Sequence, residues 1–182
     1  MNCCHHFQLM ATYNQRLNVQ VYRASTGLTA AELEEDLGAF FKSILGSLNH
    51  LLVADLLWLS RFAKHSLRYQ SLTGLNVYPK PSALDEQLYD TLDACWIVRK
   101  DLDGIIQEWL SNEVLQEDLD RDLTYTNSKG VVSSRNFAEL LSHFFNHQTH
   151  HRGQLSALLY RKGLDIGVTD FLIDIPDAVS GK

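Results

Sequence analysis

The stretch that decides the fold is residues 135–161, RNFAELLSHFFNHQTHHRGQLSALLYR. Its apolar positions recur at alternating steps of three and four, which is the spacing along one face of an α-helix. Arg161 ends the stretch, and Lys162 and then Gly163 follow, where a helix C-terminus favours basic residues and glycine. The sequence therefore predicts a long helix with a seam of Phe137, Leu140, Phe144, His147, His151, Gln154 and Leu158.

Four of the eight histidines fall between residues 143 and 151 of this predicted helix. His147 and His151 occupy seam positions, so we expect both to point into the interior. Residues four apart differ by about 40° around a helix, which allows both rings to bind one metal ion. A hydrogen-bonded core network is the alternative, because buried imidazoles need partners. His143 and His150 lie beside the seam, where a surface or supporting role is expected.

A metal site needs at least a third protein ligand, and His50 is the best candidate. It lies midway along another apolar helical stretch, and small side chains on the same face leave room for an ion or a substrate. The alternative is that this face only lets another helix pack closely. The small residues are Ser43, Gly46, Ser47 and Ala54.

Three other residues near the histidines also need an explanation. Asp55 interrupts the apolar seam around His50, and a buried carboxylate requires a cation or donors. We expect it to pair with Arg152 or with a ring N–H of a ligand histidine. Arg152 could alternatively orient an anionic substrate. Gly153 predicts either close backbone approach beside His151 or tight helix packing.

The remaining pattern predicts an all-α protein, namely a four-helix bundle with a long crossover loop and a small hairpin before the last long helix. Thr29 and Glu32 form a predicted capping box, and Ser82 with Asp85 is expected to start the third long helix. The predicted long helices cover a stretch around residues 10–24, then 37–66, 82–111 and 135–161, with the crossover at 67–81 and hairpin strands at 123–126 and 131–134.

Length and composition limit the class of protein. The chain has 182 residues, which suits one domain over 1–182, with residues 1–6 expected to form a flexible tail. A net charge of −6 without a basic run disfavours nucleic acid as a partner. The longest nearly apolar stretch, residues 51–59, is too short to cross a membrane, and the N-terminus lacks the features of a secretory signal. Three cysteines without a disulfide framework suggest a cytoplasmic location.

Two familiar metalloenzyme classes are disfavoured. Residues 147–151 have the histidine spacing of a zincin protease, but Gln148 stands where that motif needs a glutamate as general base. Di-iron bundles need two Glu-x-x-His motifs, and the sequence contains none. Cys95 lies on an apolar seam and is expected to be a small buried hydrophobe.

Three stretches together resemble the DinB-like (damage-inducible, YfiT-related) four-helix bundle metalloproteins. They are Tyr13-Asn14 with Asn18, SILGSLNHLLVADLLWLSRF at 43–62, and NHQTHHRGQL at 146–155. The resemblance implies that His50, His147 and His151 bind a divalent metal, nickel or zinc. It also implies up-down-down-up helices and a homodimer, and some relatives are transferases or isomerases that use glutathione-like thiols, mycothiol or bacillithiol.

The leading functional hypothesis is a metal-dependent enzyme, either a thiol-dependent transferase or a hydrolase, acting on an unknown small-molecule substrate. A low-molecular-weight thiol would be its second cofactor. One alternative is a non-catalytic metal-binding stress-response protein. Another is a dimeric interaction module whose seam histidines are only hydrogen bonded.

Overall fold

A computed structural model describes residues 3–127 and 129–177, and within them the chain is mostly helical with one small sheet. Helices and strands follow in the order α1 (Cys3–Ser25), α2 (Ala30–Glu34), α3 (Ile44–Phe62), the 3₁₀-helix η1 (Gln70–Val77), α4 (Leu92–Asn112), α5 (Gln116–Leu119), β1 (Asp122–Thr126), β2 (Val132–Asn136), α6 (Phe137–Arg161) and the 3₁₀-helix η2 (Phe171–Asp174).

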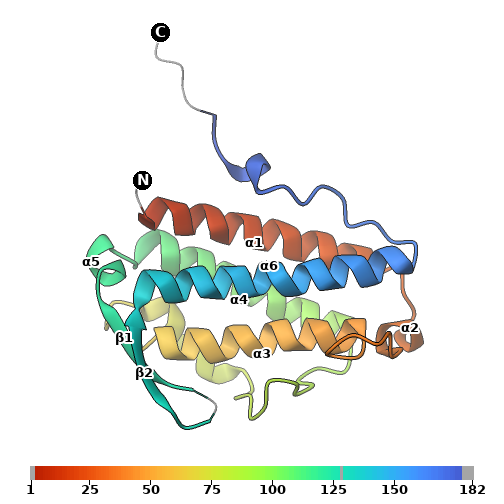
Figure 1. Cartoon of the computed structure of the whole chain (residues 1–182), viewed down its shortest axis with the longest axis horizontal. Helices are drawn as coiled ribbons and strands as arrows, with labels where there is room; N and C mark the ends of the chain where they lie inside the picture. The colour runs from red at the N-terminus through yellow and green to blue at the C-terminus, as the bar shows by residue number, and fades with distance from the viewer. Residues whose placement is uncertain (1–2, 128, 178–182) are drawn as a thin grey trace.

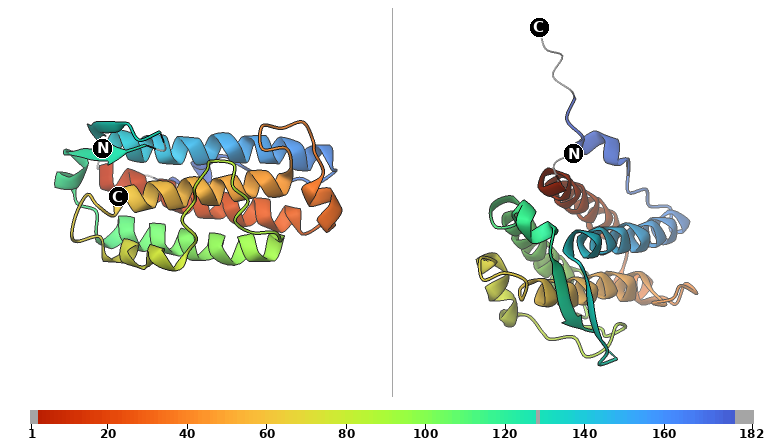
Figure 2. Two further views of the ribbon diagram at one scale, coloured as in Figure 1. Left: turned by 90° about the horizontal axis from the view of Figure 1, so that it is seen from below. Right: turned by 60° about the vertical axis from the view of Figure 1, so that its left-hand side comes forward.

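The long helices α1, α3, α4 and α6 lie side by side around one apolar interior (Figure 1). α1 packs on α4 and α6, and α3 packs on the same two helices. α1 and α6 run in one direction, whereas α3 and α4 run in the opposite one (Figure 1). The segment that joins α3 to α4 crosses the outside of α3, and η1 within it packs on both helices (Figure 2). This arrangement places the middle of α3 beside the middle of α6.

The predicted helix over residues 37–66 is shorter at both ends than expected. α3 begins after Ser43, whose hydroxyl accepts the Gly46 N–H at 2.9 Å. The preceding residues form a loop in which Lys42 has a φ of +62°, a conformation that cannot continue an α-helix. This loop folds back onto α3 and covers part of the predicted metal site.

The third long helix begins ten residues later than the Ser82 start predicted from the sequence. Ser82 donates its N–H and hydroxyl to Glu86 at 2.6 and 2.7 Å, but no helix follows. Instead, Asn49 of α3 holds the backbone of Tyr89 through two hydrogen bonds of 2.9 Å. α4 therefore starts only at Leu92, where the Thr91 hydroxyl caps it.

The N-terminal tail predicted over residues 1–6 is also corrected. Residues 1 and 2 lie outside the described part of the chain, but α1 already begins at Cys3. Cys3 and Cys4 pack against the apolar interior, and the ring of His6 lies 5.5 Å from that of Phe7. Packing against the other helices thus orders residues whose sequence gives no periodic signal.

The predicted hairpin and capping box are confirmed. β1 and β2 pair antiparallel from Asp122 opposite Asn136 to Thr126 opposite Val132. The Thr29 hydroxyl accepts the Glu32 N–H at 3.3 Å, and the Glu32 carboxylate accepts the Thr29 N–H at 2.9 Å. These two features depend on local sequence alone, which explains why they could be predicted. No helix in the described ranges is both long and apolar enough to cross a membrane.

Candidate metal centre

Three histidines from two helices meet between α3 and α6. The Nε2 atom of His50 lies 3.2 Å from Nε2 of His147 and 3.2 Å from Nε2 of His151. Their ligand atoms all lie within 4.8 Å of one another. The fold thus brings together the three residues that the sequence singled out, 97 and 101 positions apart in the chain.

The other ring nitrogens of two histidines are held by acceptors. Nδ1 of His50 donates to the backbone carbonyl of Leu84 at 2.8 Å, and Nδ1 of His151 donates to Oε1 of Gln154 at 2.9 Å. A carbonyl oxygen can only accept, so the proton of each neutral ring sits on Nδ1. The Nε2 lone pairs of His50 and His151 are therefore directed into the cluster, as metal ligation requires.

The electrostatics also keep these rings neutral at pH 7. Burial lowers the pKa of His50 to about 4 and that of His147 to about 3, and it lowers the pKa of His151 from its usual 6.5. Positive charge on the neighbouring rings would lower the pKa of each of the three further. Neutral imidazole is the form that binds a transition metal.

The donor set fits a divalent transition metal. Two lone pairs at 3.2 Å without a proton between them repel each other, and a shared cation removes that repulsion. Zinc–nitrogen bonds of about 2.0–2.1 Å in a tetrahedron put the ligand nitrogens about 3.3 Å apart. The observed spacing between His50 and its two partners is close to this value, so the site needs little rearrangement to hold an ion.

The three rings differ in their exposure. His50 is buried at 4% exposure, whereas His147 and His151 are half-buried. The prediction that both α6 histidines point into the interior is therefore corrected: the most deeply buried line of α6 passes through Gln148 and Arg152 instead. One side of the histidine cluster stays accessible from solvent.

A phenylalanine covers the other side of His50. The rings of Phe41 and His50 are stacked, with centroids 3.7 Å apart and planes 16° apart. This close approach needs glycine at position 46, since a Cβ there would lie 2.3 Å from the carbonyl oxygen of Phe41. The room predicted beside His50 from its small neighbours is thus used in part by the chain's own loop.

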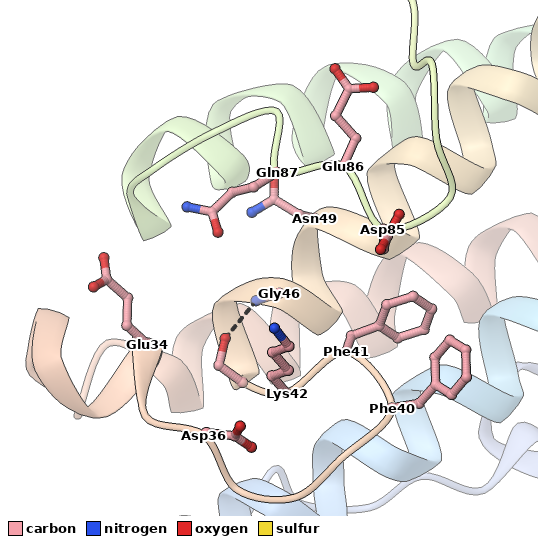
Figure 3. A pocket seen from close by; sticks show the side chains of 11 residues that line it. Glu34, Asp36, Phe40, Phe41, Lys42, Gly46, Asn49, Asp85, Glu86 and Gln87 are labelled. Carbon is pink, nitrogen blue, oxygen red and sulfur yellow. Dashed lines mark hydrogen bonds between the residues drawn. The ribbon is translucent and has the colours of Figure 1, made fainter.

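Phe41, which stacks on His50, also lines a cavity of about 470 Å³ (Figure 3). Asn49 of α3 forms part of its wall, and Lys42 lies near its middle. Its other charged side chains are the carboxylates of Glu34, Asp36, Asp85 and Glu86. The charged side chains that line this cavity are therefore predominantly acidic.

Behind the histidines lies a buried polar cluster, composed of Asn14, Asn18, Asp55, Arg99, Asp103, Gln148 and Arg152. Asp55 pairs with Arg99 at 2.6 Å, so the predicted pairing with Arg152 is wrong. Arg99 also lies 3.0 Å from Asp103, which accepts a hydrogen bond from Asn18 at 2.9 Å. Sequence reasoning missed Arg99 and Asp103, although their spacing of four on α4 is a detectable signal.

Arg152 belongs to this buried polar cluster and not to the accessible side of the histidines. Its guanidinium donates to the side-chain oxygens of Asn14, Asn18 and Gln148, and the residue is 3% exposed. Gln148 in turn donates to Asp55. Orientation of a substrate by Arg152 is therefore excluded in this conformation, and its role is to link α1 to α6.

The flanking residues have supporting places. His143 is exposed, with its ring 5.2 Å from that of Trp58, and His150 is exposed beside His151. Gln154 donates to His150 at 3.1 Å while it accepts from His151, so it connects the two rings. The close backbone approach considered for Gly153 is absent, because a Cβ there would meet no described atom within 4 Å. Cys95 is fully buried, as predicted.

Comparisons with known proteins agree with this geometry. Residues 3–178 match the DinB family. The chain is 26% identical over 163 residues to Protein DinB of Bacillus subtilis (strain 168), and the alignment covers 87% of each protein. No solved structure gives a significant match. The family match spans all four long helices and the three clustered histidines, and the chain therefore belongs to the DinB family.

Proposed function

We propose that this chain is a four-helix bundle protein that binds one divalent transition metal, nickel or zinc, through Nε2 of His50, His147 and His151. The observation that carries the proposal is the convergence of the three Nε2 atoms, with 3.2 Å from His50 to each partner. The Nδ1 contacts of His50 and His151 support it, because they leave the ligand nitrogens unprotonated.

We further propose that the protein is a metal-dependent enzyme, a thiol-dependent transferase or a hydrolase with a small-molecule substrate. A bound metal would supply Lewis acidity, which lowers the pKa of a coordinated water or thiol. The half-buried side of His147 and His151 supports access for such a molecule. Phe41 shields His50 from solvent on the opposite side, and Gln154 holds the proton of His151 on Nδ1.

A non-catalytic metal-binding role is the second candidate. It is favoured by the origin of the histidines, since one comes from α3 and two come from α6. An ion bound there would link the two helices and stabilise the fold by mass action. A homodimer, a single domain over residues 1–182, a cytoplasmic location and the use of a low-molecular-weight thiol stay predictions.

Metal content by mass spectrometry on tag-free protein tests the proposed site. We expect about one ion per chain in the wild type, loss of the ion in His147→Ala, and retention in His143→Ala, which removes an exposed histidine of the same helix. Replacement of both His5 and His6 by alanine controls for binding near the N-terminus. A wild type that is equally stable without any stoichiometric metal would contradict the proposal.

The enzymatic half has a separate test. Metal-loaded protein is mixed with low-molecular-weight thiols and electrophiles, and with esters for hydrolysis, and turnover is compared with that of the free metal. Turnover by the wild type that is lost in His147→Ala supports an enzyme. Stoichiometric metal with no turnover above the free ion contradicts the enzymatic half and supports the non-catalytic role.

A further inference from the structure

A second cavity lies along α3, under the segment that crosses from α3 to α4. It has a volume of about 620 Å³, within the range of about 300–1,000 Å³ found for small-molecule sites. Its walls come from the second half of α3, from η1 with the residues after it, and from the end of β1 with the first turn residue. None of the three clustered histidines lines it. We call it the crossover groove.

The inner wall of the crossover groove is apolar. Leu56 of α3 and Leu72 and Leu75 of η1 lie at its base and are only 3%, 2% and 8% exposed, so they offer a ligand little surface. These leucines belong to the core of the protein, so their positions are fixed by packing on α3 and α4. Above this base, the apolar surface that an aliphatic tail can reach belongs to Leu57 of α3, which is half-buried, and to Pro79 after η1, which is exposed.

The charged side chains of the crossover groove are all cationic. They are Arg61, Lys64 and Lys80, and no aspartate or glutamate lines the groove. The whole chain carries 22 acidic and only 16 basic residues, so a cavity lined by cations alone departs from the average composition of the chain. Within the described ranges, no carboxylate lies at ion-pair distance from any of the three cations.

Arg61 is held in place by aromatic rings. Its guanidinium lies 4.7 Å from the ring centroid of Trp58 and 5.5 Å from that of Tyr125. Burial lowers its pKa, and no carboxylate opposes this effect. Contact with two rings restricts the position of the guanidinium, whose N–H groups match the two oxygens of a carboxylate.

We propose that the crossover groove binds a small amphipathic anion, an aliphatic tail with a carboxylate head. The tail lies on Leu57 and Pro79, and the head pairs with Arg61, Lys64 and Lys80. This combination of an accessible apolar wall and cations without acidic partners is complementary to such a molecule in both shape and charge. The proposal is independent of the metal site.

Isothermal titration of the full-length protein with decanoate tests the proposal. Decanoate is expected to bind, whereas decyltrimethylammonium, with the same tail and a cationic head, is expected not to bind. Shortening the tail to octanoate should weaken binding by up to about fourfold for each methylene removed. Equal binding of the anionic and cationic probes, or no effect of tail length, would overturn the proposal.

Variants locate the site. Arg61→Gln should weaken decanoate binding about fivefold and Lys80→Gln about threefold, as expected for partly exposed ion pairs. Lys100→Gln is the matched control, because Lys100 also lies over a tryptophan, 5.3 Å from the ring centroid of Trp96, but outside the groove. It should leave binding unchanged. If Lys100→Gln weakens binding as much as Lys80→Gln, decanoate responds only to net charge and the proposed site is wrong.

A filled groove gives a readout that does not depend on charge. Ser60 is an exposed lining residue of α3, so Ser60→Phe should block the tail and abolish decanoate binding without removing any core side chain. Thermal unfolding by circular dichroism checks that each variant is folded. Should Arg61→Gln fail to fold, the exposed Lys80 and Ser60 variants decide the question, since unchanged binding in both would overturn the proposal.

Discussion

Two pairs of residues on α6 have the same spacing of four positions but differ in their exposure to solvent. His147 and His151 are half-buried and meet His50, whereas Gln148 and Arg152, each one residue further along, are 0% and 3% exposed. A step of one residue rotates a side chain by about 100° around a helix. The first pair therefore faces the junction with α3 near solvent, and the second faces the interior between all four long helices.

In the middle of α6, the seam positions predicted from the apolar spacing are therefore not the most deeply buried ones. The deepest polar groups are not the histidines but the members of the buried polar cluster, where Asp55 and Asp103 face Arg99. That cluster holds the helices in register, and the histidines at its edge keep an accessible side. The structure thus separates a region suited to stability from a region suited to binding.

The largest expected effect comes from breaking the buried polar cluster. Arg99→Met leaves Asp55 and Asp103 buried without their cation, so we expect the free energy of unfolding to fall by about 3–5 kcal/mol. Urea denaturation measures it, with Lys100→Met, at an exposed neighbouring position, as the control. A loss below about 1 kcal/mol would remove the distinction between the two regions.

The next largest effect is expected from removal of the metal, which would act on the proposed site of His50, His147 and His151. At a free metal concentration 100-fold above its Kd, binding stabilises the folded protein by about 2.7 kcal/mol, and a chelator should abolish this. The Tm of the wild type should therefore rise with metal concentration, and that of His147→Ala should not. Superimposable unfolding curves of the wild type with and without chelator would show that the histidines bind no stabilising ion.

A smaller effect is expected from Gln154, which fixes the proton of His151 on Nδ1. Gln154→Met keeps the length of the side chain but removes the acceptor, and we expect the metal Kd to rise about tenfold. Competition with a chromogenic chelator measures it. His150→Ala, which removes the other partner of Gln154, should change the Kd by less than about twofold. The reverse order would assign the orienting role to His150.

The smallest effect concerns Gly153, which lies next to both pairs on α6. A Cβ there would meet no described atom within 4 Å, so Gly153→Ala should raise the free energy of unfolding by about 0.5–1 kcal/mol. Gly46→Ala should have the opposite sign, because its Cβ would collide with the Phe41 carbonyl at 2.3 Å. Chemical denaturation of both variants is the measurement, and equal signs would contradict the described packing.

Local sequence signals predicted local structure well. The Thr29 capping box and the hairpin around Asn127 form as expected, since each joins neighbouring stretches of the chain: three positions separate Thr29 from Glu32, and the hairpin pairs run from Thr126 with Val132 to Asp122 with Asn136. The start of α4 was predicted ten residues too early, because the Asn49 side chain on α3 holds Tyr89 in a non-helical segment. No local pattern contains that contact across 40 positions.

The sequence by itself determined that the chain has four long helices and a hairpin, although not all helix ends. It also determined that His147 and His151 lie one turn apart on one side of a helix, because helix periodicity is a property of the backbone. The small residues around His50 made it the best candidate for the third ligand, and the family resemblance strengthened that choice. Only the tertiary structure decided which nitrogens face the cluster, that Arg99 and not Arg152 pairs with Asp55, and that Phe41 covers His50. These depend on the rotation and approach of helices distant in the chain, which are set when the whole core packs at once.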